Sequence, residues 1–98
     1  MNITKNMNGN ALAIALEGRL DTMTAPELEA VLKESMDGAE SLTLDFSKLD
    51  YISSAGLRVL LSAHKVMSAK GGMKVTNASE IVKEVFDVTG FADILTIE

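Results

Sequence analysis

Strand-like and helix-like segments alternate along this chain, and that alternation constrains its fold more than any other feature. Short stretches in which every second residue is apolar predict strands, and longer stretches with apolar residues three or four apart predict helices. Strands that alternate with helices require crossover connections, which produce a mostly parallel sheet. The expected strands are Ile3–Met7, Ala11–Glu17, Ser41–Phe46, Met73–Thr76 and Ile94–Ile97, and the expected helices are Ala25–Asp37, Ala55–Ala69 and a third between Ser79 and Gly90.

Turn and capping residues support these boundaries. Asn8-Gly9 predicts a hairpin between the first two strands, so the sheet is mixed rather than purely parallel. Thr24 precedes Glu27 by three residues, with Pro26 between them, which predicts a capping box for the first helix. The stretch 18–21 is expected to be a loop, and the alanine-rich second strand is expected to be buried on both faces. The result is one α/β domain over residues 1–98, in the order β-β-α-β-α-β-α-β.

Composition excludes several classes of function. The chain has 98 residues, no cysteine and a net charge of -5, with no cluster of basic residues. Binding to nucleic acid or to anionic lipid needs the opposite charge, so protein partners are expected instead. No apolar run is long enough to span a membrane, and the apolar part of the N-terminal stretch is too short for a signal peptide. We therefore expect a cytoplasmic protein without membrane insertion.

The stretch DYISSAGLRVLL places Ser53 and Ser54 at the expected start of the second helix. A serine there caps free N–H groups, or it accepts a phosphate, and the two roles are compatible. A phosphoserine carries a charge of about -1.5 to -2, which the helix N-terminus tolerates. If the second and third strands are parallel neighbours, Asp21 lies at the same edge of the sheet as Ser54.

Nothing in the sequence predicts catalysis, a metal site or a cofactor. A nucleophilic serine needs a base, and His64 lies about 15 Å along the helix from Ser54. His64 is therefore expected to be a partly buried or rim residue. Asp45 and Asp50 have no spacing that singles them out, and the metal and nucleotide motifs HExxH, P-loop and GxGxxG do not occur. We expect a protein that is not an enzyme.

Three stretches carry a resemblance to a known family: GRLD at 18–21, LTLDFSKLDYISSAGLRVL at 42–60, and GGMKV at 71–75 before VKEVFDVTGF. Together they resemble the STAS domain of bacterial anti-sigma factor antagonists. The resemblance implies a mixed, mostly parallel sheet with helices packed largely on one side. Longer members end in a further helix, so this helix is expected to be short or missing here.

The resemblance also implies a switch. In that family the serine before the Gly-Leu pair is phosphorylated, and it corresponds to Ser54. The kinase is the anti-sigma factor itself, a serine kinase of the histidine-kinase-like ATPase type. The unphosphorylated antagonist binds this kinase and frees a sigma factor, and a serine phosphatase restores that form. The family's acidic residue corresponds to Asp21, which is implied to help phosphoryl transfer or partner contact. The expected partner-binding residues are Asp21, Ser53, Ala55, Gly56, Leu57 and Arg58.

Two departures from the family pattern leave alternatives open. Ser53 stands where many members have Asp, which adds a second candidate hydroxyl, and Ala55 stands where others carry Ser or Thr. Arg58 is either a solvated side chain or a contact to the kinase. A STAS subunit of a stressosome-like or lipid-transport assembly, in which Ser54 need not be modified, is the alternative function. A weak homodimer through exposed methionines is also possible.

Overall fold

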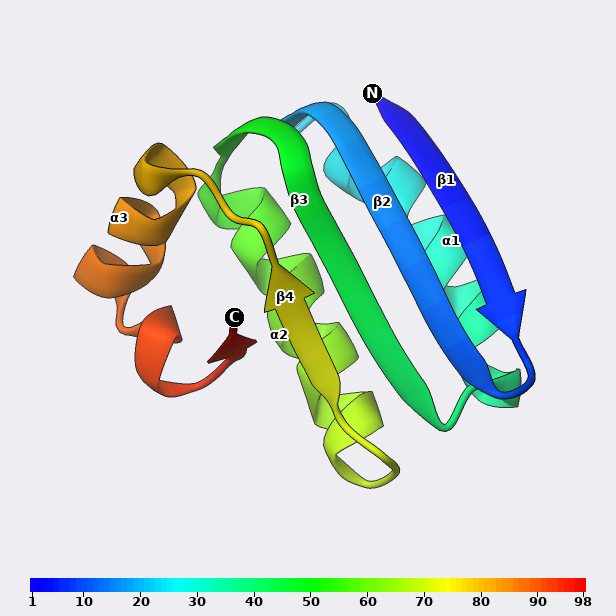
Figure 1. Cartoon of the computed structure of the whole chain (residues 1–98). Coiled ribbons are helices and arrows are strands. Elements are labelled where there is room, and N and C mark those ends of the chain that lie inside the picture. Colours follow the sequence, from blue (N-terminus) through cyan, green and yellow to red (C-terminus); the bar gives the residue numbers. More distant parts are fainter.

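The chain folds into one mixed five-stranded sheet with helices largely on one side, which confirms the predicted fold class and element order (Figure 1). The computed structural model describes residues 1–98. The strands are β1 (Asn2–Asn8), β2 (Ala11–Leu20), β3 (Ser41–Ile52), β4 (Met73–Thr76) and β5 (Thr96–Ile97). The helices are α1 (Ala25–Ser35), α2 (Ser54–Ser68) and α3 (Glu80–Thr89), with single 3-10 turns η1 (Met36–Gly38) and η2 (Phe91–Asp93).

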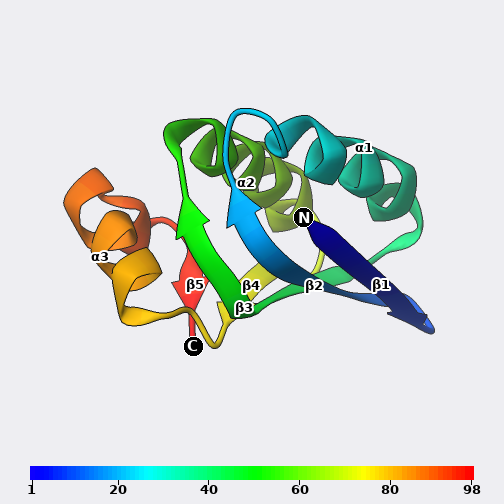
Figure 2. The ribbon, with the colours of Figure 1, turned by 90° about the horizontal axis from the view of Figure 1, so that it is seen from above.

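The strands lie in the order in which they follow one another in the chain. β1 runs antiparallel to β2, while β2, β3, β4 and β5 run parallel to one another. The predicted hairpin joins β1 to β2, and Gly9 supplies its left-handed conformation at φ +64°. Figure 2 shows α1 and α2 side by side over one face of the sheet, with α3 beside β4 and β5. No further helix follows η2.

The core lies between the sheet and α1 and α2. Leu12, Ile14 and Leu16 of β2 are fully buried because they point toward these helices. α3 closes one end of the core, where the ring of Phe86 stacks on Phe46 with centroids 6.4 Å apart. The expectation that β2 is buried on both faces is wrong, since Ala11 and Ala13 are exposed. No helix covers that side of the sheet, so the strand alternates between apolar buried residues and small exposed ones.

β2 and β3 are longer than predicted, and the expected loop at 18–21 is wrong over its first three residues. β2 continues to Leu20 and β3 to Ile52, and the two remain paired to these residues. The register shifts twice because β3 contains one extra residue after Asp45 and another after Leu49. Beyond Phe46 the buried positions of β3 are therefore three apart rather than two. A search for strict alternation consequently ends the strand at Phe46.

Candidate functional site

β2 and β3 end side by side, and this brings the two candidate segments together. Leu20 and Ile52 are the last pair of the ladder, and the N–H of Ser53 donates to the carbonyl of Leu20 at 2.9 Å. The Asp21 turn and the start of α2 therefore leave the sheet at adjacent points. Segments more than thirty residues apart in the chain become neighbours, as expected for the carboxyl ends of adjacent parallel strands.

The two serines at the start of α2 have different positions. Ser53 is the N-cap, and its half-buried side chain accepts a hydrogen bond from the N–H of Gly56 at 3.4 Å. Ser54 is the first residue of the helix, and its side chain is exposed and forms no hydrogen bond. The capping role considered for a serine at this helix start therefore belongs to Ser53. The hydroxyl of Ser54 is exposed and takes no part in capping.

Gly56 allows the first turn of α2 to lie directly against the ends of the strands. A Cβ atom at this position would lie 2.6 Å from Cγ of Leu20 and 3.0 Å from Cγ1 of Ile52. Gly56 and Leu57 are both buried, although both were expected among the partner-binding residues. Gly56 packs against the ends of β2 and β3, and Leu57 belongs to the core.

Asp21 uses its carboxylate to organise the turn before α1. Its Oδ1 accepts hydrogen bonds from the N–H groups of Met23 at 3.0 Å and Thr24 at 3.1 Å. The guanidinium of Arg19 lies beside the other oxygen, with Nε 3.8 Å from Oδ2. The hydrogen bond from the Thr24 N–H is the main reason that the pKa of Asp21 lies below its ordinary value of 3.8. Asp21 is therefore a stable carboxylate and a weak base.

Thr24 does not form the predicted capping box. Its hydroxyl donates to the carbonyl of Arg19 at 2.8 Å and accepts from the N–H of Asp21 at 2.9 Å. The side chain is thus used to close the turn that follows β2, and α1 has no side-chain cap at Thr24. A motif search for Thr-x-x-Glu overlooks Asp21, whose carboxylate accepts the Thr24 N–H that the Glu27 side chain would accept in a capping box.

Arg19 and Tyr51 were missed by sequence reasoning. They are partners in the β2–β3 register, and the guanidinium of Arg19 lies 4.3 Å from the centroid of the Tyr51 ring. A cation over an aromatic face is attracted to it, so the contact joins the ends of the two strands. Finding this pair from the sequence requires the register, which depends on the two extra residues of β3.

The segments that meet at this end of the sheet carry exposed apolar and charged side chains. Met23 is 82% exposed and Tyr51 is 36% exposed, the first being the most exposed large apolar side chain of the chain. Arg58 is exposed one turn after Ser54. A groove of about 350 Å³ lies between the amino-terminal halves of α1 and α2. Its lining residues are Thr22, Ala25, Pro26, Glu29, Ala55, Arg58, Val59 and Ser62.

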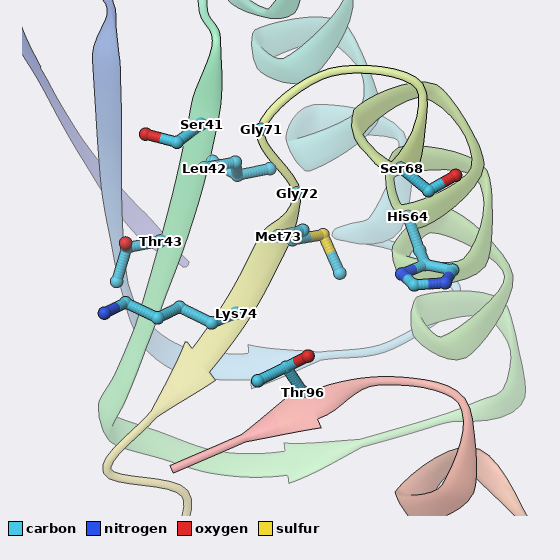
Figure 3. Close-up of a pocket in the computed structure, with 10 residues that line it drawn as sticks. All are labelled: Ser41, Leu42, Thr43, His64, Ser68, Gly71, Gly72, Met73, Lys74 and Thr96. Atoms are coloured by element: carbon cyan, nitrogen blue, oxygen red, sulfur yellow. The ribbon is translucent and has the colours of Figure 1, made fainter.

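His64 belongs to a different part of the molecule. It lies in the second half of α2 and lines a pocket of about 430 Å³ with Ser68, Met73 and Thr96 (Figure 3). Its Nδ1 is buried and has no hydrogen-bond partner, and the residue is half-buried overall. No three His, Asp or Glu side chains of the chain converge as metal ligands do. None of the helices combines the length and the apolar character needed to cross a membrane.

Comparison with known sequences places the chain among regulators. The family model described as "Mlab, STAS domain" matches residues 3–96. The putative anti-sigma factor antagonist BtrV of Bordetella bronchiseptica is 36% identical, over 99% of this chain and 85% of that protein. The anti-sigma-B factor antagonist of Bacillus subtilis is 30% identical, over 99% of this chain and 90% of that protein.

Solved structures share the fold at lower identity. The unphosphorylated form of the anti-sigma factor antagonist SpoIIAA superposes with a TM-score of 0.85 at 20% identity, covering 99% of this chain and 88% of that one. The phosphorylated form of the Bacillus cell fate determinant SpoIIAA gives a TM-score of 0.76 at 19% identity, covering 99% and 91%. With the family model matching residues 3–96 and full-length relatives at 30% identity or more, this chain belongs to the STAS domain family of anti-sigma factor antagonists.

Proposed function

We propose that this protein binds an anti-sigma factor in the cytoplasm and that phosphorylation of Ser54 ends the binding. The proposed partner is itself a serine kinase of the histidine-kinase-like ATPase type. The observation that carries the proposal is the division of roles between the two serines. Ser53 caps α2, which leaves the exposed hydroxyl of Ser54 without a hydrogen bond. A protein of the same fold has been solved in both unphosphorylated and phosphorylated forms, which supports a switch compatible with this fold.

In the proposed reaction the kinase transfers the γ-phosphoryl group of ATP to Ser54. The bond between the serine Oγ and phosphorus forms, the bond from that phosphorus to the β,γ-bridging oxygen breaks, and ADP leaves. The hydroxyl proton passes to a base of the kinase or to water. Asp21 is a poor acceptor for this proton, because its lowered pKa makes it a weak base and its Oδ1 already accepts two N–H groups. Asp21 instead holds the turn beside the serine in shape.

The unphosphorylated surface suits a protein partner. Met23, in the turn that follows β2, and Tyr51, near the end of β3, supply exposed apolar area on the two segments that meet at this end of the sheet. A phosphate at Ser54 would have to lose its water within that interface and would repel any facing carboxylate. A loss of about 3 kcal/mol weakens binding roughly a hundredfold, which is enough to release the kinase. A serine phosphatase that hydrolyses the ester would restore the binding form.

Calorimetry against the cognate kinase tests the proposal. We expect Ser54→Ala to bind the kinase and to resist inactivation by ATP, and Ser54→Asp to bind at least a hundredfold more weakly. Ser53→Ala is the matched control, because it removes the neighbouring hydroxyl and leaves the proposed acceptor. Mass spectrometry after incubation with kinase and ATP should locate one phosphate on Ser54. Equal affinities for the alanine and aspartate variants, or an unmodified chain, would contradict the switch and favour a scaffold subunit.

A further inference from the structure

Ser54 and Arg58 occupy one side of α2. They are four residues apart in the same helix, and both are exposed. Residues at this spacing have Cβ atoms about 5–6 Å apart, so their side chains are neighbours on the helix surface. A phosphate on Ser54 would extend from the helix into the space that the long side chain of Arg58 can reach.

Arg58 has no acidic partner in the unphosphorylated protein. The salt bridges of the chain use Arg19, Lys33 and Lys74 as cations. Arg19, the only other arginine of the chain, is occupied by Asp21 and by the ring of Tyr51.

The elements that meet at this end of α2 carry charges of both signs. Arg19 lies at the end of β2 and Asp21 in the turn after it, and the others are Lys48 and Asp50 in β3 and Glu27 and Glu29 in α1. Glu29 lines the same groove as Arg58 without forming a salt bridge to it. Arg58 is therefore the one arginine of the chain without a salt bridge, and it lies four residues from the proposed acceptor Ser54 in the same helix.

We propose that Arg58 binds the phosphate of phosphorylated Ser54 within the same helix, and that this contact withdraws Arg58 from the kinase interface. The inference rests on the proposed function, because it assigns a consequence to the phosphorylation of Ser54. A planar guanidinium matches the oxygens of a phosphate and forms paired, charge-assisted hydrogen bonds with them. The modification then acts twice: it adds a dianion to the interface and occupies the one free guanidinium beside it.

Phosphorus NMR on the full chain tests the contact without any kinase. Phosphoserine is placed at position 54 by semisynthesis in the parent sequence and in the Arg58→Gln and Lys65→Gln variants. Lys65 is the matched control, since it is an exposed cation of the same helix about 16 Å along the axis from Ser54. The second pKa of a phosphoserine is ordinarily about 6, and a guanidinium bound to the phosphate lowers it.

We expect Arg58→Gln to raise the phosphate pKa by at least about 0.3 of a unit, or twofold in proton affinity, and Lys65→Gln to leave it within about 0.1. The Nε–H resonance of Arg58 should also shift on phosphorylation and exchange more slowly with water. An unchanged phosphate pKa in Arg58→Gln would overturn the proposal and leave the helix N-terminus as the source of any shift. Equal rises of the phosphate pKa in Arg58→Gln and Lys65→Gln would overturn the proposal too, because they would show a general electrostatic effect of the cations rather than a contact with Arg58.

The kinase enters only in a second measurement. The phosphorylated and unphosphorylated forms of the parent and of Arg58→Gln are compared for kinase affinity by calorimetry. We expect the affinity ratio between the two forms to fall severalfold in Arg58→Gln. Because phosphoserine is introduced chemically, a kinase that does not modify Ser54 would refute the proposed function and leave the NMR result on Arg58 standing. An unchanged ratio would refute the withdrawal of Arg58 from the interface.

Discussion

The two ends of α2 are both held by close approach to a glycine, yet they leave different groups available. At the amino end, Gly56 lies against the side chains of Leu20 and Ile52. At the carboxyl end, Gly71 lies against the main chain of Glu40, and its N–H donates to the Glu40 carbonyl at 2.6 Å. Apolar contact and the hydrogen bonds of Ser53 hold the first end and leave the Ser54 hydroxyl without a hydrogen bond, whereas main-chain hydrogen bonds hold the second.

Lys70 extends the hydrogen bonding at the carboxyl end. Its ammonium group donates to the carbonyls of Met36 at 2.6 Å and Ala39 at 3.1 Å, at the end of α1 and η1. A cation near the last carbonyls of a helix is favourable. The carboxyl end of α2 is thus tied down by hydrogen bonds to the loop after η1 and to the end of α1, while the amino end combines a close-packed first turn with an exposed hydroxyl that makes no hydrogen bond.

The largest effect should come from Gly71→Ala. The added Cβ would lie 2.3 Å from the carbonyl oxygen of Glu40, a backbone atom that cannot move away alone. We expect a loss of about 3 kcal/mol in the free energy of unfolding, measured by urea denaturation. The fraction that remains folded should still be phosphorylated on Ser54. A loss below about 1 kcal/mol would show that the loop at 70–72 is looser than its contacts indicate.

Gly56→Ala should lower the free energy of unfolding less than Gly71→Ala does, but it should slow the proposed phosphorylation of Ser54. Its Cβ would meet side-chain atoms of Leu20 and Ile52 rather than main-chain atoms, and alanine favours the helix. We expect a loss of about 1–2 kcal/mol in the same urea experiment, together with slower phosphorylation of Ser54 by the kinase. A stability loss with an unchanged phosphorylation rate would mean that Gly56 does not position Ser54. The amino end of α2 would then differ from the carboxyl end only in its contacts.

Ser53→Ala should have a smaller effect on stability. It removes the N-cap of α2, whose hydrogen bond to the Gly56 N–H is long at 3.4 Å. We expect a loss of about 0.5–1 kcal/mol, at the lower end for caps, and phosphorylation that remains on Ser54. Ser79→Ala is a matched control, because Ser79 caps α3 through the Val82 N–H at 3.2 Å and lies away from the site. Modification that disappears in Ser53→Ala would reassign the acceptor to Ser53.

The smallest effect should be a change in acid sensitivity on Asp21→Asn. The pKa of Asp21 is lowered in the folded protein, mainly by the Thr24 N–H, so its contribution is present above the ordinary value of 3.8 and is lost as the pH falls below it. The asparagine variant should therefore lose less stability than the parent between pH 4 and pH 2. Asp45→Asn is the comparison outside the site, because the Ser47 N–H is the main cause of the lowered pKa of Asp45. If the free energy of unfolding depends on pH in the same way in the parent and in Asp21→Asn, the lowered pKa of Asp21 is contradicted.

Most of the fold could be predicted because apolar spacing reports burial directly. The five strands, the three helices and the meeting of Asp21 with the start of α2 all follow from periodicity and from the behaviour of parallel strands. The two extra residues of β3 could not be predicted, since a bulge interrupts the spacing on which the method depends. The mutual hydrogen bonding of Asp21 and Thr24, in which each side chain accepts the main-chain N–H of the other, was likewise hidden, because each residue forms a plausible local motif alone.

The length of β3 has a consequence for access to the residues that follow it. β4 pairs only with Leu42 to Asp45, so the last part of β3 has β2 as its single strand neighbour and extends past the rest of the sheet (Figure 1). The segment that leads into Ser54 is therefore flanked by a strand on one side only, and under the proposed function a kinase would meet β2, β3 and the start of α2 rather than β4 or β5.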